Sequence, residues 1–227
     1  MCIKLSVSNC DLVNHLVDVC TTIYLPKCSL RCPYCFNLDV VDGKNLKNYT
    51  ERTLTEEIIN SKQKNFVITG GEALFDFSVF KLIIKIINKT NPESIQVNTN
   101  MMHPNELLWF VENVDNPLVA FDLKADLSDY YKLNPIFADT KKRFLQSLNI
   151  LKINKKLKEI QCRTTLSNYV SEDTLLEMPK LLTGFGENFT WSLQDLEPKK
   201  IYSKAKVESF MRKIKSGYGI KVLHNGE

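Results

Sequence analysis

The sequence contains no long run of hydrophobic residues. Its longest apolar stretch, residues 79–87, is interrupted by Lys81 and Lys85. A membrane-spanning helix needs roughly 18 consecutive apolar residues. The first residues also lack the apolar core and the small-residue cleavage site of a secretory signal. We therefore expect a cytoplasmic protein with no membrane partner.

Paired zinc ligands, sequence repeats and a strong charge imbalance are also missing. No second C-x2-C accompanies the one that Cys32 and Cys35 form, and there are only three histidines. Structural zinc sites usually take four ligands in two separated pairs. The net charge of +4 is too small to indicate nucleic-acid binding. Because low-complexity segments and a clear linker are also absent, we expect one domain over residues 1–227.

Strand signals recur along the chain and alternate with helix signals. Runs rich in β-branched or apolar residues predict strands over residues 17–25, 66–69, 94–99, 117–124, 158–166, 189–196 and 219–223. Such alternation is typical of parallel βαβ units. About six units could form an open or closed barrel, or a doubly wound sheet. In each case functional residues belong at the carboxyl ends of the strands.

Capping residues and helical spacing predict where the helices begin. The expected starts are Thr53, Phe77, Pro104, Thr140, Ser171 and Ser203. Thr53 and Glu56 would form a capping box after a polar loop over residues 37–52. The last βα units cover residues 158–227.

The sequence has seven cysteines, and three of them, Cys28, Cys32 and Cys35, form a C-x3-C-x2-C motif. An odd, clustered set favours thiolate ligands over a disulfide framework. Thiolates suit iron–sulfur clusters, and one short loop can wrap three of them around a cubane. A four-iron cluster normally takes four cysteines, so three would leave one iron open. A zinc site or three incidental thiols are the alternatives. The other cysteines are expected to be mostly buried structural thiols: Cys2, Cys10, Cys20 and Cys162.

The cysteine loop, residues 26–37, has an aromatic residue, Tyr34, directly before Cys35. In this it resembles the signature of radical S-adenosylmethionine (SAM) enzymes. The resemblance implies an α/β fold of the partial (β/α)6 TIM-like barrel type, and a [4Fe–4S] cluster on the three cysteines. It also implies that SAM chelates the fourth iron and that the backbone at Tyr34 meets the adenine.

Gly70, Gly71 and Glu72 follow the predicted strand 66–69 and match the Gly-Gly-Glu motif of that family. Glycines permit close approach of the backbone to a ligand. The resemblance implies that Glu72 holds the ammonium group of SAM. An ordinary left-handed turn is the alternative interpretation of this segment.

Asn98 and Thr99 end the next predicted strand and match an Asp-Thr-Asn-Gly segment of the activating-enzyme branch. The resemblance places the ribose there, with a monovalent cation nearby. Asn98 replaces the acid of that segment, but its amide can still bond a ribose hydroxyl. Met101 stands where glycine is common, and the lost acid argues against the cation.

Asp122 and Lys124 match an Asp-Leu-Lys segment, and strand alternation puts both on one face. Such charges are costly to bury unless they are paired or bind a ligand. Lys124 could meet the carboxylate of SAM, and a structural ion pair is the alternative. Arg163 matches an Arg-Thr-Thr strand and Gln194 a Leu-Gln segment of the same branch. Either could contact SAM or be a buried, satisfied polar residue.

The segments 11–13 and 35–37 resemble parts of small activating enzymes for anaerobic ribonucleotide reductase, with Phe36 in place of a histidine. The resemblance implies reductive cleavage of SAM to methionine and a 5′-deoxyadenosyl radical. That radical would take hydrogen from a backbone glycine of a glycyl radical enzyme, with anaerobic ribonucleotide reductase as the expected partner. A flavodoxin- or ferredoxin-like protein would donate the electron.

Two other functions stay open. The chain could be a radical SAM enzyme acting on a peptide or a purine-like small molecule. It could also be a non-enzymatic module that binds zinc and leaves SAM intact. Basic stretches within residues 141–158 and 199–215 could bind a partner or reductant, although a solvated helix face is the favoured explanation.

Overall fold

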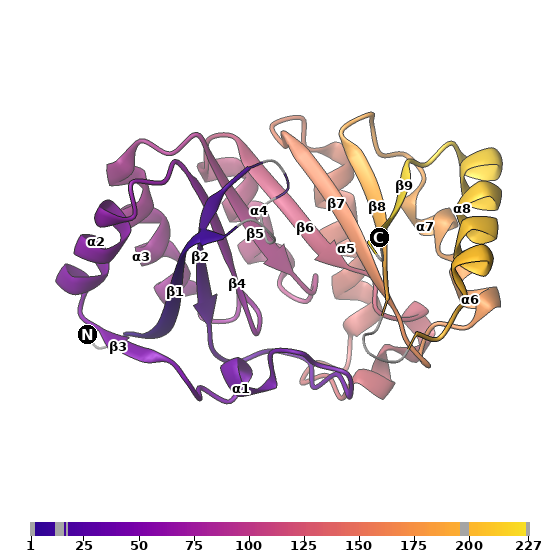
Figure 1. Cartoon of the computed structure of the whole chain (residues 1–227), viewed down its shortest axis with the longest axis horizontal. Coiled ribbons are helices and arrows are strands. Elements are labelled where there is room, and N and C mark those ends of the chain that lie inside the picture. Colours follow the sequence, from indigo (N-terminus) through magenta and orange to yellow (C-terminus); the bar gives the residue numbers. More distant parts are fainter. Residues whose placement is uncertain (1–2, 12–15, 17, 196–199, 226–227) are drawn as a thin grey trace.

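The computed structural model describes residues 3–11, 16, 18–195 and 200–225 and contains one nine-stranded sheet (Figure 1). The strand order is β3-β1-β2-β4-β5-β6-β7-β8-β9. The strands are β1 (Ile3–Asp11), β2 (Cys20–Leu25), β3 (Lys47–Tyr49), β4 (Asn65–Gly70), β5 (Ser94–Thr99), β6 (Pro117–Asp122), β7 (Glu159–Leu166), β8 (Phe189–Asp195) and β9 (Val222–Asn225).

Helical crossovers connect most of the parallel strands. The α-helices are α1 (Leu38–Val41), α2 (Glu51–Asn60), α3 (Phe77–Ile87), α4 (Pro104–Asn113), α5 (Thr140–Ile153), α6 (Glu172–Glu177), α7 (Pro179–Leu182) and α8 (Lys204–Tyr218). Two 3₁₀ helices accompany them, η1 (Asn88–Thr90) and η2 (Leu127–Leu133). Among the described helices, none is long and apolar enough to cross a membrane.

The sheet is parallel from β2 through β4 to β9, and β1 pairs antiparallel with β2 and β3. Within the described residues β3 and β9 are its two edges, so the sheet does not close on itself. Figure 1 shows it curving, with α2 and α3 near one end and α8 near the other. This confirms the predicted α/β class with parallel strands, in the form of a partial barrel.

Strand β5 shows how the sequence divides the two faces of the sheet. Ile95 and Val97 alternate with Gln96 and Asn98, and all four are buried. The apolar pair joins the main hydrophobic core. The polar pair forms a chain on the other face, with Gln96 Nε2 2.6 Å from Asn98 Oδ1. One face of the strand therefore stabilises the fold, while the other carries polar side chains toward its carboxyl end.

The region before α3 differs from the sequence prediction. The alternation of β1, in which Ile3 and Leu5 are buried and Lys4 is exposed, was not recognised as a strand. The predicted polar loop 37–52 contains α1 and β3. The predicted capping box is also misplaced: Thr50 is the N-cap of α2, and Thr53 occupies the N3 position. Threonine can fill both places because its hydroxyl both donates and accepts.

Further differences occur at element ends. The predicted helix after Ser171 is divided into α6 and α7, with Pro179 beginning the second. Proline has no N–H to continue a helical ladder. Gly219 is the left-handed C-cap of α8, so the final strand begins only at β9. Val17 and Leu196, the outer ends of two predicted strands, lie outside the described residues, as do Cys2, Leu12 and Val13.

Candidate functional site

One cavity opens at the carboxyl ends of the parallel strands. Predicted site residues that line it are Cys28, Cys32, Tyr34, Cys35, Gly70, Gly71, Asn98, Thr99, Asp122, Lys124, Arg163 and Gln194. They come from the loops after β2, β4 and β6 and from the carboxyl-terminal halves of β4, β5, β6, β7 and β8. Of the residues predicted for the site, Glu72 alone is not part of the lining.

The three cysteines of the loop are half-buried free thiols. Burial raises the pKa of the Cys28 thiol to about 12, with the Glu72 charge as the second cause. Burial also raises the pKa of Cys32. Among the described residues, no three His, Cys, Asp or Glu side chains converge tightly enough to hold a single metal ion. A cubane places each thiolate on a different iron atom, so its ligands need not converge on one point.

Backbone hydrogen bonds hold the cysteine loop at both sides. Lys27 N donates to Val41 O of α1 at 2.9 Å, and Lys27 itself has a φ of 65°. Arg31 N donates to Leu133 O at 2.8 Å. Cys35 N closes a turn on Cys32 O at 3.1 Å. The segments 38–41 and 127–133 thus fix the loop before any ligand is present.

The structure explains why glycine stands at positions 70 and 71, which the sequence alone does not. A Cβ on Gly71 would lie 1.9 Å from Lys27 O, and one on Gly70 would lie 2.4 Å from Leu25 O. Gly71 N donates to Leu25 O at 2.8 Å, and Glu72 N donates to Lys27 O at 2.9 Å. Gly70 also has a φ of 112°, which favours glycine. The close approach that these glycines permit is to the start of the cysteine loop.

Glu72 is buried, with 1% of its surface exposed, and its carboxylate binds protein groups. Oε1 accepts from Thr99 Oγ1 at 2.8 Å and from Leu74 N at 3.1 Å. Oε2 accepts from Asn100 N at 2.7 Å. Burial raises its pKa to about 7, against the lowering effect of these hydrogen bonds. Glu72 thus bridges the ends of β4 and β5, and its contact with the ammonium group of SAM stays a prediction.

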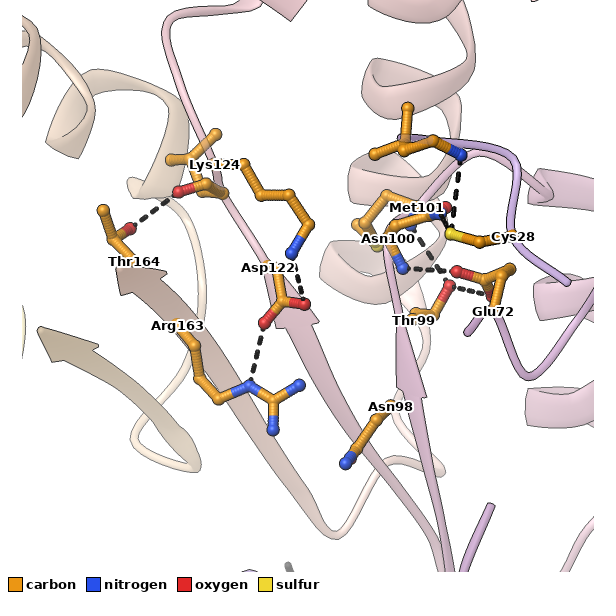
Figure 2. A network of polar contacts seen from close by, with 12 residues as sticks. Cys28, Glu72, Asn98, Thr99, Asn100, Met101, Asp122, Lys124, Arg163 and Thr164 are labelled. Carbon is orange, nitrogen blue, oxygen red and sulfur yellow. Dashed lines mark hydrogen bonds and ion pairs between the residues drawn. The ribbon is translucent and has the colours of Figure 1, made fainter. Parts of the chain in front are cut away.

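Asp122 lies between two cations (Figure 2). Lys124 Nζ lies 2.9 Å from Oδ2, and Arg163 Nε lies 2.9 Å from Oδ1. Burial would raise the pKa of Asp122, but the Arg163 and Lys124 charges keep it below its ordinary value. Burial would lower the pKa of Lys124, but Asp122 raises it. Two cations against one anion leave this side of the cavity with an excess positive charge, which suits an anionic ligand.

The remaining predicted residues complete the lining. Tyr34 donates from its hydroxyl to Lys124 O at 3.2 Å, and its ring lies 5.7 Å from that of Tyr169. Asn98 donates to Thr69 Oγ1 at 3.3 Å. Thr99 contributes to the lining although its hydroxyl is bound to Glu72. Gln194 lines the cavity from the end of β8.

The structure adds lining residues that the predicted site did not include: Leu30, Phe36, Asn37, Val41, Thr69, Asn100 and Thr165. Asn100 directly follows the Asn98-Thr99 segment. Thr165 has the same strand parity as Arg163, so alternation along β7 was a signal for it. Phe36 is 69% exposed, which marks it as a rim residue. Nothing in the sequence pattern signals Val41, because it reaches the cavity from a helix that was not predicted.

Residues outside the cavity test two further expectations. Cys20 and Cys162 are buried as predicted, whereas Cys10 is exposed.

Some basic residues on α5 are paired with neighbouring side chains. Arg143 binds Asp139 at 2.7 Å and lies 3.8 Å over the ring of Phe137. These contacts favour the interpretation of that stretch as a helix face.

The donor set fits an iron–sulfur cluster with a small charged ligand. Three thiols from one loop share a cavity with the cationic group around Asp122. Cys28 Sγ accepts from Leu30 N and from Asn100 Nδ2, each at 3.4 Å. Sulfur acceptors with such donors are typical of cluster ligands. The cationic group lies opposite, where a carboxylate could bind.

Comparison with known proteins identifies the family. The model of the Radical SAM superfamily matches residues 22–182. A protein of Methanocaldococcus jannaschii, provisionally named a glycyl-radical enzyme activating enzyme, is 26% identical over 211 residues, which cover 85% of this chain and 83% of that protein.

Solved structures agree on the fold. A radical SAM methyltransferase from Sphaerobacter thermophilus superposes with a TM-score of 0.64 at 14% identity, over 90% of this chain and 66% of that chain. The protein anSMEcpe with bound AdoMet superposes with a TM-score of 0.58 at 17% identity, over 88% of this chain and 63% of that chain. The chain belongs to the radical SAM superfamily, and its cofactors are a [4Fe–4S] cluster and S-adenosylmethionine.

Proposed function

We propose that this radical SAM enzyme installs a glycyl radical on a partner protein, with anaerobic ribonucleotide reductase as the first candidate. The similarity to the M. jannaschii protein over 85% of this chain supports the proposal. The observation that carries it is the shared cavity of three thiols and the Asp122–Lys124–Arg163 group. We further propose that residues 1–227 act as one cytoplasmic domain, reduced by a flavodoxin- or ferredoxin-like protein.

The predicted cluster ligands and the two cations of the cavity each have a proposed task. Cys28, Cys32 and Cys35 would hold three irons of the cluster. Lys124 and Arg163 would orient the carboxylate of SAM, since their combined charge exceeds that of Asp122.

Other groups of the site would position the rest of SAM. Asn98 would bond a ribose hydroxyl and Gln194 would bound the opposite side of the cavity. The backbone at Tyr34 would meet the adenine. Glu72 would act as a positioning residue through Thr99 and Asn100.

The cofactors supply the difficult chemistry when bound: one-electron cleavage of SAM gives methionine and a 5′-deoxyadenosyl radical that can abstract hydrogen from a glycine Cα. The chain supplies orientation and shields the cavity from water. Glu72 and Asp122 are both engaged by protein donors. This step requires no general base, and we assign none.

A two-stage experiment tests the proposal. The chain is reconstituted anaerobically with iron and sulfide, reduced with dithionite and incubated with SAM, and 5′-deoxyadenosine is measured. The candidate reductase is then added, and electron paramagnetic resonance records whether a glycyl radical forms on it. A variant with Cys28, Cys32 and Cys35 changed to alanine is the control.

The outcomes separate the candidate functions. Formation of 5′-deoxyadenosine and of the glycyl radical supports the activating enzyme. Cleavage of SAM without a radical on any glycyl radical enzyme would indicate a peptide or a purine-like small molecule as substrate. A chain that binds zinc and never cleaves SAM would overturn the enzymatic proposal.

A further inference from the structure

We propose that Asn100 is a positioning residue that raises the reduction potential of the cluster by donating a hydrogen bond to the Cys28 sulfur. Figure 2 shows the two side chains joined on the side of the cavity opposite Asp122. Asn100 Nδ2 lies 3.4 Å from Cys28 Sγ. The inference rests on the proposed function, because it requires a cluster bound to Cys28.

The surrounding hydrogen bonds fix which end of the Asn100 amide faces the sulfur. Met102 N donates to Asn100 Oδ1 at 3.0 Å, and a backbone N–H can only donate, so that atom must be the oxygen. The amide nitrogen is therefore the end that reaches Cys28, and it also lies 3.0 Å from Ser29 Oγ. A flipped amide would place two donors together at Met102 and an oxygen against the sulfur.

The backbone of Asn100 is held as firmly as its side chain. Asn100 N donates to Glu72 Oε2 at 2.7 Å. The next residue, Met101, has a φ of 70°, its N donates to Thr99 Oγ1 at 3.1 Å, and its O accepts from Ser147 Oγ at 2.9 Å. Asn100 is only 4% exposed. The donor thus has little freedom to turn away from the sulfur or to be replaced by water.

A fixed donor at a ligand sulfur favours the reduced cluster. Reduction adds one negative charge, which spreads over the cluster and its thiolates. A partial positive charge on an N–H stabilises the reduced state more than the oxidised one. Burial strengthens the effect because the local dielectric constant is low. Reduction of the cluster precedes SAM cleavage, so this bond would make the first electron transfer easier.

Substitutions at Asn100 test the inference without relying on activity. Asn100→Ser keeps an acceptor that Met102 N can use two residues on, but its side chain is too short to donate to the sulfur. Asn100→Asp keeps the shape and presents an oxygen to Cys28. The matched control is Asn98→Ala, because Asn98 lines the same cavity but its bonds go to Gln96 and Thr69.

The measurement is a redox titration of the reconstituted chain without SAM, followed by the electron paramagnetic resonance signal of the reduced cluster. We expect Asn100→Ser to lower the reduced-to-oxidised ratio at a fixed potential about three- to tenfold, where tenfold corresponds to about 59 mV for one electron. Asn100→Asp should lower it further, and Asn98→Ala should leave it unchanged.

Only molecules that carry a cluster give the signal, so the midpoint potential can be measured even when a variant assembles the cluster incompletely. An Asn100→Ser midpoint equal to or above that of the Asn98→Ala control overturns the inference. If the unaltered chain assembles no four-iron cluster, the proposed function itself fails. If that chain cleaves SAM while the Asn100 variants show no shift, the proposed function stands and only this inference is lost.

Discussion

The two walls of the cavity are built differently. The wall formed by the ends of β2, β4 and β5 is held by buried hydrogen bonds, as between Glu72 and Asn100. The wall formed by β6, β7 and β8 is held by charge, with Asp122 between Lys124 and Arg163. Figure 2 shows both walls. Exposure differs too: Glu72 is buried as a whole residue, with 1% of its surface exposed, whereas 26% of the Asp122 side chain is exposed.

The difference shows how one site can combine rigidity with ligand binding. Removing one partner of a buried hydrogen bond lowers stability, because the other partner is left buried and unsatisfied. The first wall is therefore suited to fixing the cysteine loop. Charges with partial exposure can exchange a protein partner for a ligand at lower cost. The second wall is therefore suited to binding SAM, and substitutions in the two walls should have different consequences.

The largest effect is expected from the thiols of the cysteine loop, which the first wall holds in place. Changing Cys32 to alanine removes one of the three iron ligands, so a stable four-iron cluster should not assemble and SAM cleavage should fall by more than about 10³-fold. Iron content, visible absorbance and 5′-deoxyadenosine formation measure this. Cys10→Ala is the control, since Cys10 is exposed and lies outside the cavity. Full turnover by the Cys32 variant would contradict the assignment of the ligands.

Gly71→Ala should destabilise the same wall. Its Cβ would meet Lys27 O at 1.9 Å, and because that atom belongs to the backbone, the start of the cysteine loop must shift. We expect a loss of about 3 kcal/mol in the free energy of unfolding, measured by urea denaturation. Gly217→Ala in α8 is the matched control, because nothing lies within 4 Å of its Cβ. That change should stabilise the helix by up to about 1 kcal/mol. Equal effects at both positions would refute the packing argument.

The buried carboxylate of the first wall should make stability depend on pH. The pKa of Glu72 is raised to about 7 in the fold from an ordinary value of 4.5. The folded chain holds this proton more tightly than the unfolded chain. The contribution of protonated Glu72 to the free energy of unfolding is therefore complete below about pH 4.5. It is lost as pH rises through about 7, which lowers the free energy of unfolding by up to about 3 kcal/mol.

Urea unfolding of the iron-free chain between pH 5 and 8 measures this slope. Glu72→Gln, which cannot ionise, is the comparison and should be flatter across the same range. A slope that survives unchanged in the Gln variant would assign it to another group.

The smallest effect is expected in the second wall. Arg163→Met leaves Asp122 paired with Lys124 and removes the excess positive charge. The cluster should assemble normally, while SAM binding should weaken about tenfold, or about 1.4 kcal/mol. Equilibrium dialysis on the reconstituted chain measures the affinity, with Arg212→Met on the exposed face of α8 as control. Loss of the cluster in the Arg163 variant would show that the two walls are not separable.

The sequence predicted the contents of the cavity better than the way in which its walls are held. The cysteine motif and the strand ends are local patterns, and the parallel sheet brings the ends together at one edge. The orientation of Glu72, by contrast, depends on donors 27 and 28 residues away in the sequence. The need for glycine at position 71 depends on the path of the cysteine loop, which passes close to it. These contacts join distant segments, so no local pattern contains them.

At position 101 the backbone conformation favours glycine, whereas the packing of the side chain favours methionine. A left-handed backbone costs a residue with a Cβ about 1–2 kcal/mol, and Met101 has a φ of 70° while its side chain is fully buried. A glycine would relieve the backbone but would leave an apolar void, at about 2–5 kcal/mol for a buried methionine. The buried side chain of Met101 therefore stabilises the fold by more than its backbone conformation costs, so glycine at this position is unfavourable.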